Sequence, residues 1–345
     1  MFHIVGHGLW SVAAIFLVAA VVIAFAGTKL ARIADALADR TGMGEIIAGA
    51  LFVGASTSLP GEMTSITTAA QGAPSIAIGN ALGGLTVQTM FLAVADLAYR
   101  RANLEHAAAS VTGLAQGVLL VTMLTIPLIA SVYPAVTVWG VHPASLLIVL
   151  SYGFGLRLLS RIQRQPMWHP VKTEETRPSL SKDERGPGSI STQSLWVRFA
   201  AYALVTAACG YAIGEAAIWI VANTGFSESI VGTVLAAVAN SLPELVTAIA
   251  AVRIGAVNLA VGDVIGGNAF EVLFLSAADL FQSGSIYHFF TPSDQATALI
   301  AILMTGVLLL GMLRREKAGI ARIGFESALV LLLYVCSVGL VFLAP

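Results

Sequence analysis

The sequence predicts an all-α integral membrane protein with ten transmembrane helices, arranged as two inverted five-helix repeats. Three observations lead to this fold class. Of the 345 residues, 57% are hydrophobic and 11% are charged, whereas a soluble domain carries about 25% charged residues. Residues 42–97 and 225–280 align without a gap at an offset of 183, with 20 of 56 positions identical. Finally, all 18 lysines and arginines fall on one side of a ten-span arrangement.

Ten apolar runs are long enough to cross a bilayer. They cover residues 8–27, 46–71, 74–99, 107–131, 136–158, 196–221, 229–252, 258–281, 294–314 and 324–344. The first run lacks the basic segment and small-residue cleavage site of a signal peptide, so we interpret it as a helix that stays. Spans two and seven contain Pro60 and Pro243, and we expect both helices to be broken there.

One long polar stretch, residues 161–194, is rich in Pro, Ser, Lys, Arg and Glu. This composition is typical of a flexible linker. It divides the chain into a first five-helix half, residues 1–160, and a second half, residues 195–345. The duplicated segments 42–97 and 225–280 begin at spans two and seven. Because five spans separate them, the two copies cross the membrane in opposite directions.

The basic residues set the orientation. By the positive-inside rule, the side that carries all of them is cytoplasmic. Both termini are then outside, and the central loop is cytoplasmic. We expect a multi-pass protein of the plasma (inner) membrane with the lipid bilayer as its partner. Nothing in the sequence favours nucleic acid, and the oligomeric state stays open.

The two prolines free backbone carbonyl groups inside the membrane, because proline has no N–H to donate. Such groups are costly in lipid unless they line a cavity or meet a partner, and a cation is a suitable partner. Oxygen-bearing side chains surround both breaks: Thr57, Ser58, Asn240 and Ser241. Hard cations prefer such oxygen ligands.

Two carboxylates lie close to the second break. Glu244 directly follows Pro243, and Glu271 lies near the middle of span eight. A charge at the centre of a membrane helix costs about 2.5–3.5 kcal/mol on insertion scales. Both groups therefore call for a cation or protons to neutralise them. Gln88 occupies the position of Glu271 in the first copy, and Gly61 that of Glu244.

Paired glycines four residues apart, Gly79/Gly83 and Gly262/Gly266, give spans three and eight faces that allow close helix packing. This packing is expected to bring Gln88 and Glu271 near the breaks.

The order of these residues resembles a known family. The segments Thr57-Ser58-Leu59-Pro60 and Asn240-Ser241-Leu242-Pro243-Glu244 look like the alpha-repeats of the sodium/calcium exchanger family. The segments Gly79-Asn80-x-x-Gly83 and Gly262-Asp263-x-x-Gly266-Gly267-Asn268 resemble the second helix of each repeat. The resemblance implies a secondary active cation antiporter, whose ion is held by side chains from the broken helices and their partner helices.

Residue by residue, the resemblance implies that Glu244 and Glu271 are the acidic ligands and that Gln88 is the amide ligand. Thr57, Ser58, Asn240 and Ser241 take the hydroxyl positions, and the backbone carbonyls one turn earlier belong to Gly54 and Ala237. The cations are Ca²⁺, Na⁺ or H⁺, which are transported species; no cofactor is expected.

Two departures from the family pattern stand out. The first repeat reads Pro60-Gly61-Glu62 where the family has Glu directly after Pro, so the carboxylate is missing or displaced to Glu62. One residue along a helix is a turn of about 100°, which favours an interhelical or interfacial role for Glu62. Gly84 and Gly267 replace a family serine, and the longer Gln88 and Glu271 can fill the space.

Structural roles compete with these assignments. Glu244 can serve the helix break, Glu271 can bond a neighbouring helix, and Gln88 can be a packing amide. Asp96 and Asp279 lie near helix ends, which favours a conformational or interfacial role. Asn80, Asp263 and Asn268 either support the backbone or bind the ion.

We expect an antiporter that exchanges Ca²⁺, or a similar divalent cation, for Na⁺ or H⁺ by alternating access. A proton-coupled or monovalent-cation antiporter on the same scaffold and a non-transporting descendant are the alternatives. The sequence offers no intramembrane nucleophile–base or metal pair, so we do not expect an enzyme. It leaves open the physiological ions, their stoichiometry and the direction of transport.

Overall fold

The computed structural model describes residues 8–41, 53–99, 102–108, 110–171, 173–174, 176, 191–317, 319 and 324–343. Within them the regular elements are helices, apart from a single bridge between Val138 and Val141. The elements are α1 Leu9–Thr41, α2 Gly54–Ala70, α3 Pro74–Ala98, α4 Leu104–Ala107, α5 Val111–Val132, α6 Pro143–Arg164, α7 Thr192–Thr224, α8 Glu228–Ile230, η3 Val231–Ala236, α9 Ala237–Asn240, α10 Leu242–Arg253, α11 Val257–Glu271, α12 Leu273–Phe281, η4 Ile286–Phe289, α13 Pro292–Arg314 and α14 Phe325–Leu343.

In the described part of the chain, eight helices are long and apolar enough to cross a membrane, and the bent pair Glu228–Asn240 and Leu242–Arg253 makes a ninth span. The helix α2 has 17 described residues, and residues 46–52 of the predicted second span lie outside the described residues. The protein is therefore an all-helical, multi-span membrane protein, as the sequence predicts.

The expected start of span five is wrong. Residues 136–142 form no helix, and α6 begins at Pro143 and runs on to Arg164. Proline suits the first turn of a helix because its missing N–H has no partner to lose there. The His142 side chain caps this helix by accepting a hydrogen bond from the backbone N–H of Ala144 at 3.0 Å.

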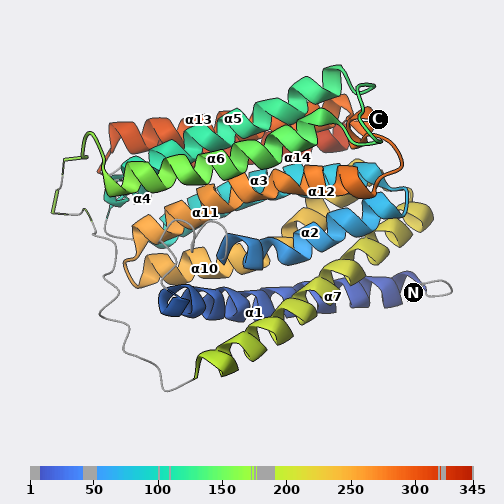
Figure 1. Cartoon of the computed structure of the whole chain (residues 1–345), viewed down its shortest axis with the longest axis horizontal. Helices are drawn as coiled ribbons and strands as arrows, with labels where there is room; N and C mark the ends of the chain where they lie inside the picture. The colour runs from blue at the N-terminus through green and yellow to red at the C-terminus, as the bar shows by residue number, and fades with distance from the viewer. Residues whose placement is uncertain are drawn as a thin grey trace.

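The helices form three layers (Figure 1). One outer layer holds α5, α6, α13 and α14, and the middle layer holds α2, α3, α10, α11 and α12. The third layer is the pair α1 and α7, which cross each other and cover α2 and α10. The middle layer is consequently enclosed on both faces.

Equivalent helices of the two halves run in opposite directions. The bounds of α1 and α7, Leu9–Thr41 and Thr192–Thr224, differ by 183 at both ends, so the sequence offset also holds outside the duplicated segments. The turn after α2 uses Gly72 (φ 80°) and the turn after α10 uses Gly255 (φ 82°), a backbone conformation that glycine adopts without strain. These equivalent turns lie at opposite ends of the bundle.

Basic residues occupy the last turns of α1, α6, α10 and α13, namely Arg40, Arg161, Arg164, Arg253 and Arg314. All these helices end on the left of Figure 1, at what we call the basic end. The helix α1 begins and α14 ends at the opposite, far end on the right.

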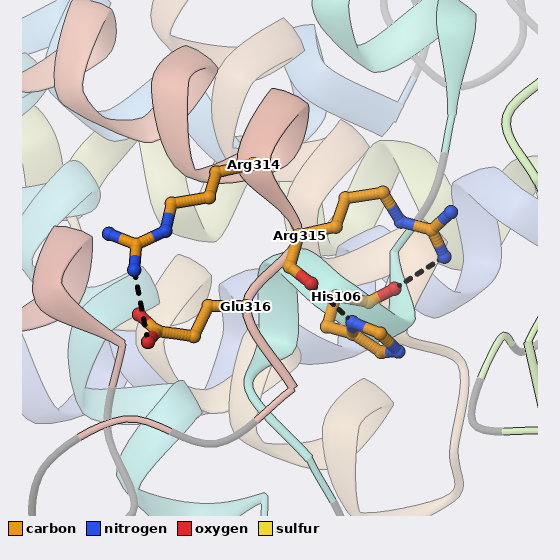
Figure 2. A network of polar contacts seen from close by, with 4 residues as sticks. All are labelled: His106, Arg314, Arg315 and Glu316. Atoms are coloured by element: carbon orange, nitrogen blue, oxygen red, sulfur yellow. Dashed lines mark hydrogen bonds and ion pairs between the residues drawn. The ribbon is translucent and has the colours of Figure 1, made fainter.

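Loop contacts hold the basic end together (Figure 2). The Nη2 of Arg315 donates to the carbonyl of His106 at 3.0 Å, and Nδ1 of His106 donates to the carbonyl of Arg315 at 2.6 Å. These reciprocal bonds join α4 to the end of α13. The neighbouring pair of Arg314 and Glu316, 3.3 Å apart, lies at the surface and contributes little.

Each crossing helix contacts a proline of the middle layer through a glycine. A Cβ at Gly27 of α1 would lie 2.6 Å from Cγ of Pro243. A Cβ at Gly210 of α7 would lie 2.8 Å from the Cα of Pro60. Because Gly27 and Gly210 are 183 residues apart, the two contacts are equivalent, and both leave no room for a side chain.

The glycine face of α3 packs as predicted. A Cβ at Gly79 would lie 2.9 Å from the backbone nitrogen of Thr233, and one at Gly83 would lie 2.7 Å from its Cα. The backbone of α3 therefore approaches that of η3 closely, which is the use of paired small residues in membrane helices.

Of the two predicted helix breaks, only the second interrupts a helix. Leu242–Arg253 is bent by 43° from Glu228–Asn240, whereas α2 continues through Pro60. The expected break at Pro60 is wrong. Polar side chains contact the α2 backbone just after the proline: Thr64 Oγ1 donates to Pro60 O at 3.0 Å, and Asn80 Nδ2 donates to Gly61 O at 2.9 Å.

Candidate cation site

The bend in the second broken helix places a carboxylate at the start of a new helix. Ser241 lies between α9 and α10, and its N–H donates to the carbonyl of Ala237 at 3.1 Å. Pro243 follows in the first turn of α10, where its missing N–H costs least. Glu244 comes next, also in this first turn, where the partial positive charge of a helix N-terminus favours a carboxylate.

Glu244 and Glu271 are both buried, each with 4% of its surface exposed. Neither Glu244 Oε1 nor Oε2 has a hydrogen-bond partner among the described residues, and the same holds for Glu271 Oε2. The helices that carry them, α10 and α11, are joined by the turn at Gly255 and contact each other. Buried carboxylate oxygens without donors are suited to receive a cation or a proton.

Gln88 and Glu271 meet across the pseudo-two-fold axis that relates the repeats. Nε2 of Gln88 donates a hydrogen bond to Oε1 of Glu271, although the two residues are equivalent positions 183 apart. Gln88 lies 14 residues from the far-end start of α3, and Glu271 lies 14 residues from the basic-end start of α11. The pair therefore lies near the middle of the bundle.

Two glycines make room for these long side chains. A Cβ at Gly84 would lie 2.5 Å from Oε2 of Glu271, and one at Gly267 would lie 3.6 Å from Oε1 of Gln88. The structure thus places the ends of Glu271 and Gln88 in the space that the two glycines leave, as the sequence predicts.

Asn240 is fixed by its amide nitrogen. Its Nδ2 donates to Thr64 Oγ1 at 3.0 Å and to Asn80 Oδ1 at 2.8 Å, whereas its Oδ1 has no partner among the described residues. Asn268 has the same arrangement: its Nδ2 donates to Thr89 Oγ1 at 2.9 Å, and its Oδ1 is left without a partner. Both amides therefore present a carbonyl oxygen.

The hydroxyl groups beside the prolines are buried as well. Thr57 Oγ1 donates to the carbonyl of Gly54 at 3.0 Å, so the lone pairs of this oxygen remain available. Ser58 Oγ has no partner in the described part of the chain. Ser241 has 1% of its surface exposed. The buried oxygen atoms of this region thus come from hydroxyls, amides, carbonyls and carboxylates.

The first repeat has no carboxylate at the equivalent of Glu244. A Cβ at Gly61 would lie 2.9 Å from the ring of Phe274 and 3.6 Å from Cβ of Asn240, so an aromatic ring fills the space in which a side chain at position 61 would lie. Glu62, one residue on, is only partly buried, unlike the other nine predicted ligand residues. Its role as a ligand stays a prediction.

Asp96 and Asp279 hold loops rather than line the central site. Asp96 accepts from Leu104 N at 2.7 Å and from Ser327 Oγ at 2.8 Å. Asp279 accepts from the backbone N–H groups of His142 and Ile286, both at 2.8 Å. The conformational role that the sequence favoured for these two residues is confirmed.

Sequence reasoning missed Thr64, Thr89 and Phe274. The two threonines position Asn240 and Asn268, and Phe274 covers Gly61. For Phe274 the sequence did contain a signal, because Phe91 and Phe274 are identical at the offset of 183. The described residues contain no group of three His, Cys, Asp or Glu side chains that could hold a metal ion. The candidate site accordingly has two carboxylates, and the other polar atoms near it are oxygen atoms of neutral groups.

This fold, with its duplicated and inverted helices around buried carboxylates, defines a membrane transporter rather than an enzyme. The sequence profile of the family described as "Sodium/calcium exchanger protein" matches residues 11–160 and 194–343. The chain therefore belongs to the sodium/calcium exchanger family.

Two relatives cover most of the chain. The inner membrane protein YrbG of Escherichia coli (strain K12) is 26% identical over 303 residues, which cover 86% of this chain and 87% of YrbG. The putative antiporter CaxA of Alkalimonas amylolytica is 27% identical over 331 residues, which cover 88% of this chain and 92% of CaxA.

Two solved structures share the fold. The crystal structure of the H⁺/Ca²⁺ exchanger CAX has a TM-score of 0.71 at 13% identity, over 96% of this chain and 84% of CAX. The sodium-calcium exchanger NCX_Mj has a TM-score of 0.60 at 18% identity, over 95% of this chain and 98% of NCX_Mj.

Proposed function

We propose that this protein is a secondary active antiporter that exchanges Ca²⁺, or a similar divalent cation, for Na⁺ or H⁺. One observation carries the proposal: Glu244 and Glu271 are both buried on the contacting helices α10 and α11, and three of their four carboxylate oxygens have no partner among the described residues. Family membership gives the class of transporter, and the related CAX and NCX_Mj structures belong to exchangers of Ca²⁺ with H⁺ and with Na⁺.

The two carboxylates couple the two transported ions. Two buried negative charges balance one divalent cation, and two protons or monovalent cations balance them equally well. Competition for the same carboxylates couples the two ions, because only one charge-balanced load fits at a time. When the site is empty and carries two negative charges, the protein changes poorly between its two open forms. This prevents either ion from moving without exchange for the other.

The inverted repeat supplies the movement. Two halves of opposite orientation can exchange shapes, so that a central site opens first to one end and then to the other. The crossing pair α1 and α7 contacts the middle layer at Pro243 and Pro60 through glycines. We assign this pair as the part that moves across the site.

The protein is proposed to lie in the plasma (inner) membrane with its basic end in the cytoplasm and both termini outside. The arginines in the last turns of α1, α6, α10 and α13 support this orientation through the positive-inside rule. The related YrbG is an inner membrane protein.

A second candidate is a proton-coupled or monovalent-cation antiporter on the same scaffold. The ring of Phe274 beside Gly61 favours it, because the first repeat then lacks the carboxylate that Glu244 provides in the second. A site with two carboxylates holds fewer cations at once than one with three. A non-transporting descendant is the third possibility, and it predicts binding without turnover.

Calcium uptake into proteoliposomes tests the main proposal. Uptake should require an opposing Na⁺ or H⁺ gradient, and Glu244→Gln should abolish it because the neutral amide cannot balance the cation. Glu316→Gln is the matched control, since Glu316 pairs with Arg314 at the surface. Glu62→Gln shows whether the displaced carboxylate takes part. Wild-type uptake rates in folded Glu244→Gln protein would refute the assignment.

The coupling ion follows from the same vesicles. Uptake that needs a Na⁺ gradient at fixed pH identifies a sodium exchanger, and uptake that needs only a pH gradient identifies a proton exchanger. Sodium–proton exchange without calcium movement would support the second candidate.

A further inference from the structure

Three aromatic rings form a chain that runs from an outer layer of helices to the first proline segment. The ring centroids of Tyr152 and Phe270 lie 5.8 Å apart with an interplanar angle of 73°, and those of Phe270 and Phe274 lie 6.3 Å apart at 87°. Both contacts are edge-to-face, a geometry that aromatic pairs prefer. The chain begins at Tyr152 on α6 and ends at Phe274 on α12, whose ring lies against Gly61 of α2.

Both sides of the contact between Phe274 and Gly61 are held in place. Phe274 has 1% of its surface exposed, and Phe270, which supports it, has 7%. Close-packed rings cannot turn aside without displacing their neighbours. The carbonyl of Gly61 accepts a hydrogen bond from Asn80 Nδ2 at 2.9 Å. A Cβ at position 61 would lie 2.9 Å from Cε2 and 3.4 Å from Cζ of the ring, so the ring closes this position even to a methyl group.

The other half of the pseudo-symmetric structure does not repeat this support. The offset of 183 gives the equivalent pairs Tyr152/Val335, Phe270/Val87 and Phe274/Phe91. The residue that supports Phe274 directly is thus replaced by Val87, which carries no ring, and Phe91 packs in an apolar cluster with Val87, Ala237 and Tyr334. The half with the supported ring has Gly61 after its proline, whereas the other half keeps a carboxylate at the equivalent position.

The number of carboxylates at the centre sets the number of positive charges that the site takes up. A buried carboxylate in a membrane protein requires a neutralising charge. With position 61 closed, Glu244 and Glu271 are balanced by one divalent cation or by two monovalent cations or protons. A third carboxylate at position 61 would require a third positive charge. The residue that closes this position therefore affects the stoichiometry of exchange.

We propose that Phe274 determines the coupling ratio of this transporter, because its supported ring limits the central site to two carboxylates and therefore to two monovalent cations or protons per divalent cation. The inference rests on the proposed antiport. Such an exchange moves no net charge, so the membrane potential neither drives nor opposes it. The coupling ion can be Na⁺ or H⁺, since both carry one charge.

The first experiment tests the ring contact and does not depend on transport. Melting temperatures are measured in detergent for Gly61→Ala in wild type and in Phe274→Ala. The added methyl group should lower the melting temperature of wild type by a few degrees and should not lower that of Phe274→Ala, where the ring is absent. Gly306→Ala, with open space around its Cβ, is the matched control. A Gly61→Ala effect that is equal in both backgrounds would overturn the proposal.

The second experiment measures the coupling ratio. Calcium uptake into proteoliposomes is recorded while K⁺ and valinomycin set the membrane potential. Wild type should take up Ca²⁺ at a rate that does not depend on the potential, and so should Phe274→Ala, which loses the ring but gains no carboxylate. In Gly61→Glu/Phe274→Ala a third carboxylate takes a third monovalent cation, so an inside-positive potential should accelerate uptake severalfold. Phe91→Ala is the matched ring control and should behave as wild type.

Three results would overturn the proposal. They are potential-dependent uptake by wild type, potential-dependent uptake by Phe274→Ala, and a Gly61→Glu/Phe274→Ala protein that is inactive or insensitive to the potential. A ratio that changes in Glu62→Gln would also contradict it, because a third carboxylate would then already take part. Wild-type protein without any calcium transport would instead refute the proposed function, while the melting temperatures still report on the ring contact.

Discussion

Glu271 and Gln88 show how the centre of the protein accommodates longer side chains than the family pattern implies. The ends of both side chains lie over glycines, and Glu271 Oε2 takes the space that a Cβ at Gly84 would need. The sequence predicted this exchange of volume, because the glycines and the longer side chains occur together. It could not predict that Phe274 covers Gly61, since that contact joins helices far apart in the chain and depends on how α12 packs on α2.

The first prediction at this scale concerns position 84. Gly84→Ser places a Cβ about where Glu271 Oε2 now lies, so we expect it to displace the carboxylate and weaken calcium binding about tenfold, equal to about 1.4 kcal/mol of binding free energy, with a matching loss of transport. Adding Glu271→Asp shortens the side chain by one carbon and should restore most of the activity. Gly339→Ser, which has open space around its Cβ, is the control. A double variant as impaired as the two single variants combined would contradict the volume exchange.

A second prediction concerns the pH dependence of stability at the basic end. Burial, followed by the nearby carboxylates of Asp96 and Glu326, raises the pKa of Glu105 in the α4 loop well above its ordinary value of 4.5. The folded state therefore retains a proton that the unfolded state releases above pH 4.5. This contribution to stability is complete below that pH and is lost as the pH rises through the higher folded pKa, by at most about 1.4 kcal/mol per pH unit.

Thermal unfolding of Glu105→Gln in detergent between pH 5 and pH 8 measures this effect. The amide does not titrate, so the decrease of the melting temperature with pH should be smaller in this variant than in wild type. Glu174→Gln, at an exposed position of the central loop, should keep the wild-type dependence. Identical pH profiles for Glu105→Gln and wild type would disprove the assigned protonation.

At the scale of elements, the two copies of one motif fold differently. The helix containing Pro243 bends at Ser241, whereas α2 passes through Pro60 without interruption. The sequence predicted two breaks because proline removes the same backbone bond in both. It could not show how neighbouring helices contact each segment, such as Asn80 of α3, which donates to Gly61 O just after Pro60. Local sequence locates a weak point in a helix, and the neighbours determine whether it bends.

The contact between α7 and α2 gives a prediction at this scale. A Cβ at Gly210 would meet backbone atoms of Pro60, which cannot move aside as a side chain does. Gly210→Ala should therefore push α7 away from α2, destabilise the protein by about 1–3 kcal/mol and slow transport. Gly306→Ala is the matched control, because its Cβ points into open space within a helix. A melting temperature for Gly210→Ala at or above that of Gly306→Ala would show that the contact is not tight.

For the whole molecule, the inverted repeat was the most predictable property. The offset of 183, first seen in two 56-residue segments, also relates the bounds of α1 and α7 and their contacts with the prolines. Hydropathy predicted that the spans exist. It did not predict the start of α6, because an apolar turn precedes Pro143. The distribution of charge within the symmetric frame was visible in the sequence, because Glu244 and Glu271 stand opposite Gly61 and Gln88 at the offset of 183.

Isothermal titration of the purified protein with Ca²⁺, repeated at several Na⁺ concentrations and pH values, tests the central claim most directly. We predict that wild type binds Ca²⁺ and that Na⁺ or protons weaken this binding by competition. Glu244→Gln and Glu271→Gln should each abolish it while the proteins remain folded. Calcium binding that is unchanged in both variants, or that neither Na⁺ nor protons affect, would contradict a shared carboxylate site.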